Sequence, residues 1–169
     1  MEPVPADGVP TGPDLLATVA QRAIARVIDY LLVPVTLMLA FGLPTAEQDG
    51  GDVTFPRWVV IVITMGFVGY ETAMVATRGQ TVGKMAVGIR VADLRTGANP
   101  RLERALWRSL VVAGVLLVFG QFFGPLLAVA IYLTALADPI TLRGLPDRVA
   151  GTVVVHVDEG RDSWRRPGP

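Results

Sequence analysis

Residues 22–42 read RAIARVIDYLLVPVTLMLAFG, and this stretch decides the fold. In its part Val27–Gly42 the only charged residue is Asp29. An ionised carboxylate that faces hydrocarbon costs several kcal/mol, so Asp29 is expected to face a protein interior or a watery cavity. At about 100° per residue, Arg26 lies about 40° from Arg22 around the helix, and Asp29 lies about 20° to the other side. The stretch therefore predicts a membrane span in which Arg22 and Arg26 neutralise Asp29.

The composition points the same way. The chain has 169 residues, half of them hydrophobic, with 15 acidic and 15 basic residues. Its apolar residues gather into long runs between charged segments, which is typical of several membrane spans joined by short loops. With one histidine, His156, and no cysteine, the sequence predicts no metal site, no cofactor and no nucleophile–base pair. We therefore expect a chain that is not an enzyme.

The apolar runs predict an all-α membrane protein built as a bundle of four transmembrane helices. Pro34 is expected to kink the first span, because it removes a backbone hydrogen bond. The uncharged run 110–137 is longer than one span needs, and its middle, GQFFGP, has the composition of a turn. A single long tilted helix there, giving three spans in all, is the alternative. The four spans are predicted at about residues 22–43, 57–77, 101–120 and 124–142.

The loops differ in charge. Residues 78–108 hold seven basic and two acidic residues, whereas residues 44–56 hold three acidic residues and no basic one. By the positive-inside rule, the N-terminus and the basic segment 78–108 are expected to be cytoplasmic and the loop 44–56 external. The insertion machinery's preference accounts for the basic residues. Since no aromatic residues are interleaved with them, nucleic-acid binding is not expected.

Two short segments read as strands. Residues 86–93 alternate and are rich in β-branched residues, and residues 151–157 (GTVVVHV) read in the same way. Because isolated strands are marginally stable, the two are expected to pair as a small cytoplasmic sheet. The N-terminal tail 1–14, with four prolines and three acids, and the tail 158–169 are expected to be disordered. The domain then covers residues 15–157.

A second acid, Glu71, lies in the second predicted span. It is seven residues from Arg78, as Asp29 is seven residues from Arg22, so the two carboxylates are expected at a similar depth on oppositely directed spans. Two carboxylates in one semi-buried site repel, so one could hold a proton and exchange it for a metal cation. Alternatively, the charges form an ion-paired latch between helices. The bases available to both acids are Arg22, Arg26, Arg104 and Arg108.

The segment Gly79–Lys84 reads GQTVGK, which looks like a phosphate-binding loop. It is one residue short of that motif, Met85 replaces the Ser or Thr, and a membrane span precedes it instead of a strand. The sequence therefore favours a tight interfacial turn with Lys84 near lipid headgroups.

Several of these segments, in this order, resemble the RDD family of small bacterial membrane proteins. The family's arginine and two aspartates match Arg22, Asp29 and Asp147, and the resemblance covers about residues 22–157. Many members carry histidine before the second aspartate, where this chain has Pro146. The resemblance implies a bacterial inner (plasma) membrane protein with several spans, of a family in which some members are linked to sodium/proton exchange. The segments are RAIARVID (22–29), YETAMVATRGQTVGKMAVGIRV (70–91), the part with Arg104 and Arg108, and LPDRVAGTVVV (145–155).

Two functions follow as hypotheses. The first is a small cation/proton transporter or transport-associated protein, with a sodium ion or proton as its ligand. It would work as a homo-oligomer, because four helices are too few for most alternating-access schemes. The second is a non-catalytic membrane scaffold or accessory subunit whose Arg/Asp network is a structural latch, with a basic loop that docks a partner or anionic lipid. The candidate residues are Arg22, Arg26, Asp29, Glu71 and Asp147, supported by Lys84, Arg104 and Arg108.

Overall fold

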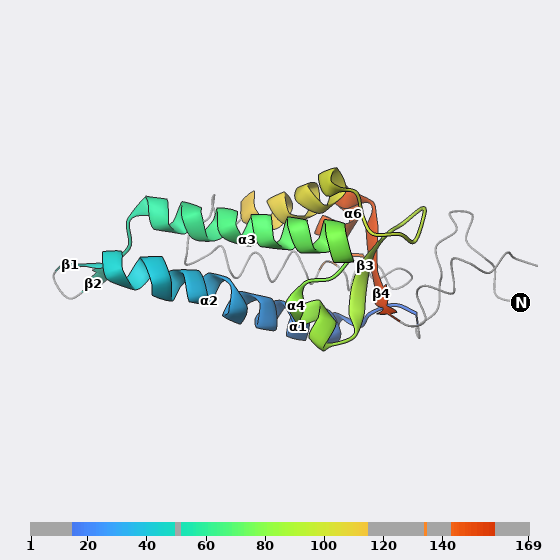
Figure 1. The fold of residues 1–169 in the computed structure, drawn as a ribbon, viewed down its shortest axis with the longest axis horizontal. Helices are drawn as coiled ribbons and strands as arrows, with labels where there is room; N and C mark the ends of the chain where they lie inside the picture. Colours follow the sequence, from blue (N-terminus) through green and yellow to red (C-terminus); the bar gives the residue numbers. More distant parts are fainter. Residues whose placement is uncertain (1–14, 50–51, 115–133, 135–142, 158–169) are drawn as a thin grey trace, which may run out of the picture.

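The structure of the protein is a computed structural model. It describes residues 15–49, 52–114, 134 and 143–157 of the chain. This part is mostly helical and elongated, with the helices along the long axis and a two-stranded sheet at each end (Figure 1). The two predicted disordered tails lie outside the described residues.

The first predicted span is a helix in several sections. Helix α1 (Val19–Leu32) begins at a capping box, in which Thr18 Oγ1 accepts from the Gln21 amide at 3.2 Å and Gln21 Oε1 accepts from the Thr18 amide at 2.9 Å. Helix α2 (Pro34–Leu37) follows after a break at Val33. The structure therefore divides the helix directly before Pro34, where the sequence predicted a kink. The helix continues through the π-helical turn η1 (Met38–Gly42) and the 3₁₀ turn η2 (Leu43–Thr45).

The second predicted span is helix α3 (Arg57–Arg78), which agrees with the prediction to within one residue. It ends at Gly79, whose φ of 72° is left-handed and therefore favours glycine. Among the described residues, Val19–Thr45 and Arg57–Arg78 are the two helices that are long and apolar enough to cross a membrane.

A third helix covers residues 102–114 and begins where the sequence predicted. The remainder of the predicted spans 101–120 and 124–142 lies outside the described residues, and so does the choice between four spans and three.

Strands β3 (Ile89–Asp93) and β4 (Thr152–His156) pair antiparallel, with Ile89 opposite His156 and Asp93 opposite Thr152. The predicted pairing of 86–93 with 151–157 is confirmed in its main feature. Its start is wrong, because residue 86 ends a short helix, α4 (Val82–Ala86).

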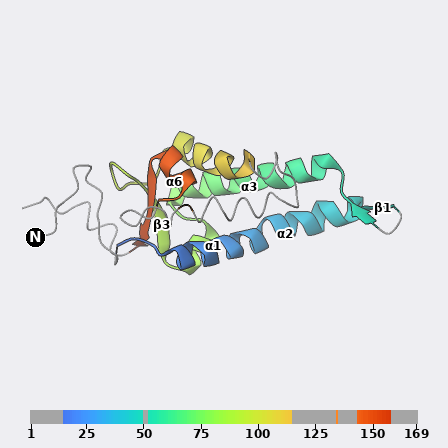
Figure 2. The ribbon, with the colours of Figure 1, turned by 180° about the vertical axis from the view of Figure 1, so that it is seen from behind.

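Three other elements, one helix and two strands, were not predicted. Helix α6 (Leu145–Ala150) precedes β4. In the acidic loop 44–56, β1 (Glu47–Asp49) and β2 (Asp52–Thr54) form an antiparallel hairpin. The views from both sides place this hairpin and the β3–β4 sheet at opposite ends of the molecule (Figures 1 and 2).

The apolar core lies at the β3–β4 end. Here Ala25 of α1, Val75 of α3 and Ala105 of the third helix pack with Ile89 and Val154 of the sheet. Farther along, the helices expose large apolar side chains and bury charged ones. A helix that is apolar outside and charged inside suits a lipid surrounding better than water. Exposed apolar side chains include Ile24, Leu31, Leu39, Phe41, Ile61, Met65 and Leu106.

Candidate functional site: a buried charged cluster

Seven charged side chains from five helices meet between the core and the apolar part of the bundle, and we call them the charged cluster. Six are buried residues and Arg22 is partly buried. The cluster brings together seven of the eight candidate residues. Its members are Arg22, Arg26 and Asp29 of α1, Glu71 of α3, Lys84 of α4, Arg108 of the third helix and Asp147 of α6.

Glu71 is the most heavily paired acid of the cluster. Arg26 binds it through two parallel hydrogen bonds, Nη2 to Oε1 at 2.8 Å and Nη1 to Oε2 at 2.9 Å. Arg108 Nη1 donates to Oε1 at 2.7 Å, and Lys84 Nζ lies 3.7 Å from the same oxygen. Two-pronged arginine–carboxylate pairs are among the strongest polar contacts in proteins. Glu71 thus joins α1, α3, α4 and the third helix.

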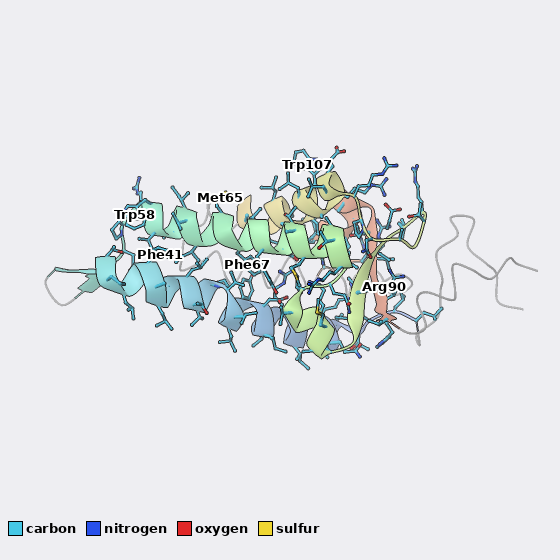
Figure 3. The ribbon with its side chains drawn as sticks, in the orientation of Figure 1. Phe41, Trp58, Met65, Phe67, Arg90 and Trp107 are labelled. Carbon is cyan, nitrogen blue, oxygen red and sulfur yellow. The ribbon has the colours of Figure 1, made fainter. Side chains whose placement is uncertain are left out.

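The Arg26 guanidinium also lies over two aromatic rings. Its Cζ is 5.9 Å from the centre of the Tyr30 ring and 5.6 Å from that of Phe67, and the two rings stack at 5.1 Å. Phe67 lies between the first-span helix and α3 (Figure 3). Cation–π contacts strengthen where water is excluded. The rings therefore fix the plane in which Arg26 meets Glu71.

Asp29 is fully buried, as the sequence predicted. Its Oδ1 accepts from the Tyr70 hydroxyl at 2.9 Å and from the Gly83 amide at 2.8 Å, and its Oδ2 accepts from the Thr81 hydroxyl at 2.6 Å. Thr81 is the N-cap of α4, so Asp29 caps the start of that helix from a neighbouring one. The nearest cation that pairs with it is Lys84, at 4.0 Å.

The predicted partners of Asp29 are therefore wrong. Arg22 pairs with Asp147 at 3.3 Å, and Arg26 pairs with Glu71. Helical side chains lean toward the N-terminus of their own helix. Both arginines precede Asp29 in α1, so they point away from its carboxylate and toward other elements.

Helix α4 lies unusually close to α1. A Cβ on Gly83 would lie 2.0 Å from the Ala25 carbonyl oxygen and 3.0 Å from Asp29 Cγ. A side chain of any size is excluded there, and the missing Cβ lets the Gly83 amide reach the carboxylate.

Lys84 is buried, so its predicted position near lipid headgroups is wrong. Helix α4 folds back onto α1, which carries this side chain inward, and Nζ donates to Thr81 Oγ1 at 3.2 Å. Burial lowers the pKa of the Lys84 ammonium to about 7, helped by Arg26 and Arg108 and opposed by Glu71 and Asp29. Lys84 is thus a member of the cluster that can change its charge near neutral pH.

Asp147 closes the cluster beside the sheet. Its Oδ1 accepts from Arg108 Nε at 2.9 Å and from the Thr152 hydroxyl at 3.3 Å, and its Oδ2 accepts from Arg22 Nη1 at 3.3 Å. Burial raises the pKa of this carboxyl, but Arg108 and Arg22 outweigh burial and hold the pKa below its ordinary value. Pro146 lies in the first turn of α6, where its missing N–H costs no helical hydrogen bond.

Arg104 is the one candidate that the cluster leaves out. It pairs with Asp93 of β3 and is partly exposed. Sequence reasoning missed three uncharged members of the site: Tyr70, Thr81 and Gly83. The only local signal was a threonine placed to cap a helix that starts at Val82.

Every carboxylate oxygen of the cluster accepts a hydrogen bond from a donor on another element. Asp147, Arg108, Glu71, Lys84 and Asp29 form one continuous path of contacts from α6 to α1. Chemically, such a path can hold helices together, and its lysine can gain or lose a proton.

Comparison with known families shows which family the chain belongs to. The model of the RDD family matches residues 16–151, which is more than half of the sequence and contains all seven residues of the charged cluster. Searches of curated proteins and of solved structures found no match. The two apolar helices agree with a membrane protein of this kind. The chain therefore belongs to the RDD family.

Proposed function

We propose that the chain is a non-catalytic scaffold or accessory subunit of the bacterial inner membrane, with several spans, whose charged cluster is a structural latch. One observation carries the proposal. Each of the carboxylate oxygens of Asp29, Glu71 and Asp147 accepts a hydrogen bond from another element of the protein. Carboxylates saturated in this way are suited to holding elements in place.

A latch answers a physical need of membrane helices. Lipid tails are as apolar as leucine, so burial of apolar surface does little to bring spans together. A buried ion pair supplies specificity instead, because removing one partner leaves an uncompensated charge at a cost of about 3–5 kcal/mol. The cluster joins α1 to α3 through Arg26 and Glu71, and joins the third helix to α6 through Arg108 and Asp147.

The charge distribution supports an orientation. The acidic hairpin lies at one end of the helices, and the basic segment 78–108 has its loops at the other (Figure 1). The positive-inside rule then assigns the β3–β4 sheet and the N-terminus to the cytoplasm. The charged cluster belongs to the cytoplasmic end of the spans.

Ion flux in sealed vesicles tests the proposal. We expect purified protein in vesicles to show no sodium-dependent proton movement above that of empty vesicles. Sodium-dependent flux that disappears in Asp29→Asn and persists in Glu103→Gln, an exposed acid outside the cluster, would contradict the latch. The same preparations must show unchanged circular dichroism, so that loss of fold is not mistaken for loss of flux.

The second candidate is a small cation/proton transporter that works as a homo-oligomer. Lys84 favours it, because its pKa is about 7 and its Nζ lies 3.7 Å from Glu71 and 4.0 Å from Asp29. Loss of its proton would change the charge felt by two carboxylates on two candidate spans. Flux sensitive to both Lys84→Met and Asp29→Asn would support this candidate over the latch.

A further inference from the structure

A basic rim at the β3–β4 end combines exposed arginines with exposed apolar side chains. Arg78 ends α3 and Arg101 precedes the third helix, and both are exposed. Asn99 brings them close, since its Nδ2 donates to the Thr77 carbonyl at 2.9 Å and its Oδ1 would lie 2.6 Å from a Cβ on Gly79. Among the described residues, neither arginine forms an ion pair.

The positions of Arg78 and Arg101 along the helix axes follow from the contact between Arg108 and Glu71. Helix α3 and the third helix run in opposite directions, and Arg108 meets Glu71 at 2.7 Å. Arg101 is seven residues before Arg108, and Arg78 is seven residues after Glu71. Each is therefore about 10 Å beyond that contact toward the sheet. The backbones of the two arginines therefore lie at one level, outside the charged cluster.

The third helix has one face buried against the bundle and one face exposed. Ala105, Arg108 and Ser109 are buried against the bundle, whereas Leu102 is 64% exposed and Trp107 is 54% exposed. Trp107 lies on the outer side of this helix (Figure 3). Tryptophan concentrates where a membrane meets water. Arg101 lies six residues before Trp107, about 9 Å farther toward the sheet and the water.

We propose that Arg78 and Arg101 bind the headgroup phosphates of anionic phospholipids, whose glycerol and upper acyl region packs on Leu102 and Trp107. Charge complementarity selects this occupant. Two unpaired guanidiniums face an anionic phosphate, and the apolar side chains face the tail. Two acids lie near these arginines in the sequence. Asp93 pairs with Arg104 instead, and Glu103 is exposed. The inference depends on the membrane placement proposed above.

Quenching of tryptophan fluorescence by brominated lipids measures this preference. The chain has three tryptophans, so the double variant W58F/W164F leaves Trp107 as the only tryptophan, which is excited selectively over tyrosine near the red edge of the absorption band. It is reconstituted in mixed phosphatidylcholine and phosphatidylglycerol bilayers with bromine on the tails of one lipid or the other. We expect brominated phosphatidylglycerol to quench Trp107 at least about twofold more per mole, since each arginine near the surface favours anionic lipid about fivefold.

Two variants of the W58F/W164F protein test whether Arg78 and Arg101 cause the preferential quenching. Arg78→Gln with Arg101→Gln should bring the quenching ratio to about one. Arg57→Gln, an exposed arginine at the opposite end of α3, should leave the ratio unchanged. The proposal is wrong if both brominated lipids quench Trp107 equally in the protein that keeps Arg78 and Arg101. It is also wrong if the preference for phosphatidylglycerol persists after both arginines are replaced by glutamine.

The variant W107F/W164F keeps Trp58 as its only tryptophan. It distinguishes a wrong lipid-binding proposal from a protein that is not in the membrane at all. Trp58 is 48% exposed and lies near the hairpin end (Figure 3). If bromine on either lipid quenches Trp58 and Trp107 but without lipid preference, the protein is in the membrane and the rim proposal is wrong. If neither tryptophan is quenched, both proposals are wrong.

Discussion

At the scale of single residues, the carboxylate of Asp29 adds a second N-terminal cap to α4, through the Gly83 amide, beside the cap that Thr81 supplies to the Lys84 amide. Its three short hydrogen bonds go to Tyr70, Thr81 and Gly83. Asp29, Thr81 and Gly83 are buried, whereas Tyr70 is partly exposed. The stability of α4 thus depends on a residue that lies about 50 positions earlier in the sequence.

Substitution of Asp29 tests this cap. Asp29→Leu leaves two buried donors, the Thr81 hydroxyl and the Gly83 amide, without their acceptor, at about 1–3 kcal/mol each, so we expect the free energy of unfolding to fall by about 2 kcal/mol or more. Asp29→Asn keeps one acceptor oxygen and should lose less. Denaturant unfolding in detergent, followed by circular dichroism, measures both. A leucine variant as stable as the unmodified protein would rule out the cap.

Lys84 predicts a pH dependence. Its pKa falls from 10.5 to about 7 on folding, so between these values the unfolded chain binds more protons than the folded one. The free energy of unfolding therefore rises with pH across this window. Lys84→Met should remove that rise, measured as the difference in unfolding free energy between pH 7 and pH 9.5. Equal pH slopes in the two proteins would contradict the burial of this ammonium.

Residue types were easier to predict from sequence than their pairings. A lone acid in an apolar run must be buried, and this reasoning found Asp29 without any structural information. The pairings depended on which way each side chain leans and on where α4 folds. Neither Arg26 with Glu71 nor Lys84 with Asp29 could be read from spacing along one helix.

At the scale of elements, the contact between α1 and α4 is the least tolerant of change. Gly83→Ala would place a methyl group 2.0 Å from the Ala25 carbonyl oxygen, so α4 must move away from α1. Overpacking of this kind costs about 1–3 kcal/mol, and loss of the Asp29 cap adds to it. We expect a clear drop in thermal unfolding temperature.

Gly69→Ala is the matched control, since a Cβ at Gly69 of α3 meets nothing within 4 Å. Alanine favours helix over glycine by about 0.5–1 kcal/mol, so this variant should be as stable as the unmodified protein or slightly more so. Equal behaviour of the two alanine variants would show that α4 is not packed so closely.

Elements with a clear hydrophobic pattern were predicted well. Helix α3 and the pairing of β3 with β4 follow from run length and alternation. Helices α4 and α6 have five and six residues, too few to show a helical period. They persist because neighbouring elements cap and cover them, which no local pattern records.

At the scale of the whole molecule, the two ends of the bundle should lie on opposite sides of the membrane. The chain has no cysteine, so single cysteines give clean labels. We expect Gln48→Cys in the hairpin to react with a membrane-impermeant maleimide in intact spheroplasts. Thr96→Cys, in the turn after β3, should react only after permeabilisation. Labelling of both positions in intact cells would contradict the orientation.

Sequence predicted long apolar helices because hydropathy acts over long segments, and it predicted the family because several short motifs occur in the right order. The convergence of five helices on one charged cluster could not be predicted. It depends on distant contacts, such as Arg22 with Asp147, which are separated by 125 positions.

The most direct test of the latch is a double-mutant cycle on Arg26 and Glu71, the pair that joins the two candidate spans. Unfolding free energies are measured for the unmodified protein, Arg26→Leu, Glu71→Leu and the double variant. Each single variant should lose about 3–5 kcal/mol, because it strands a buried charge. The double variant should lose at least about 1 kcal/mol less than the sum of the two. Single variants within about 0.5 kcal/mol of the unmodified protein, or strictly additive losses, would contradict a latch.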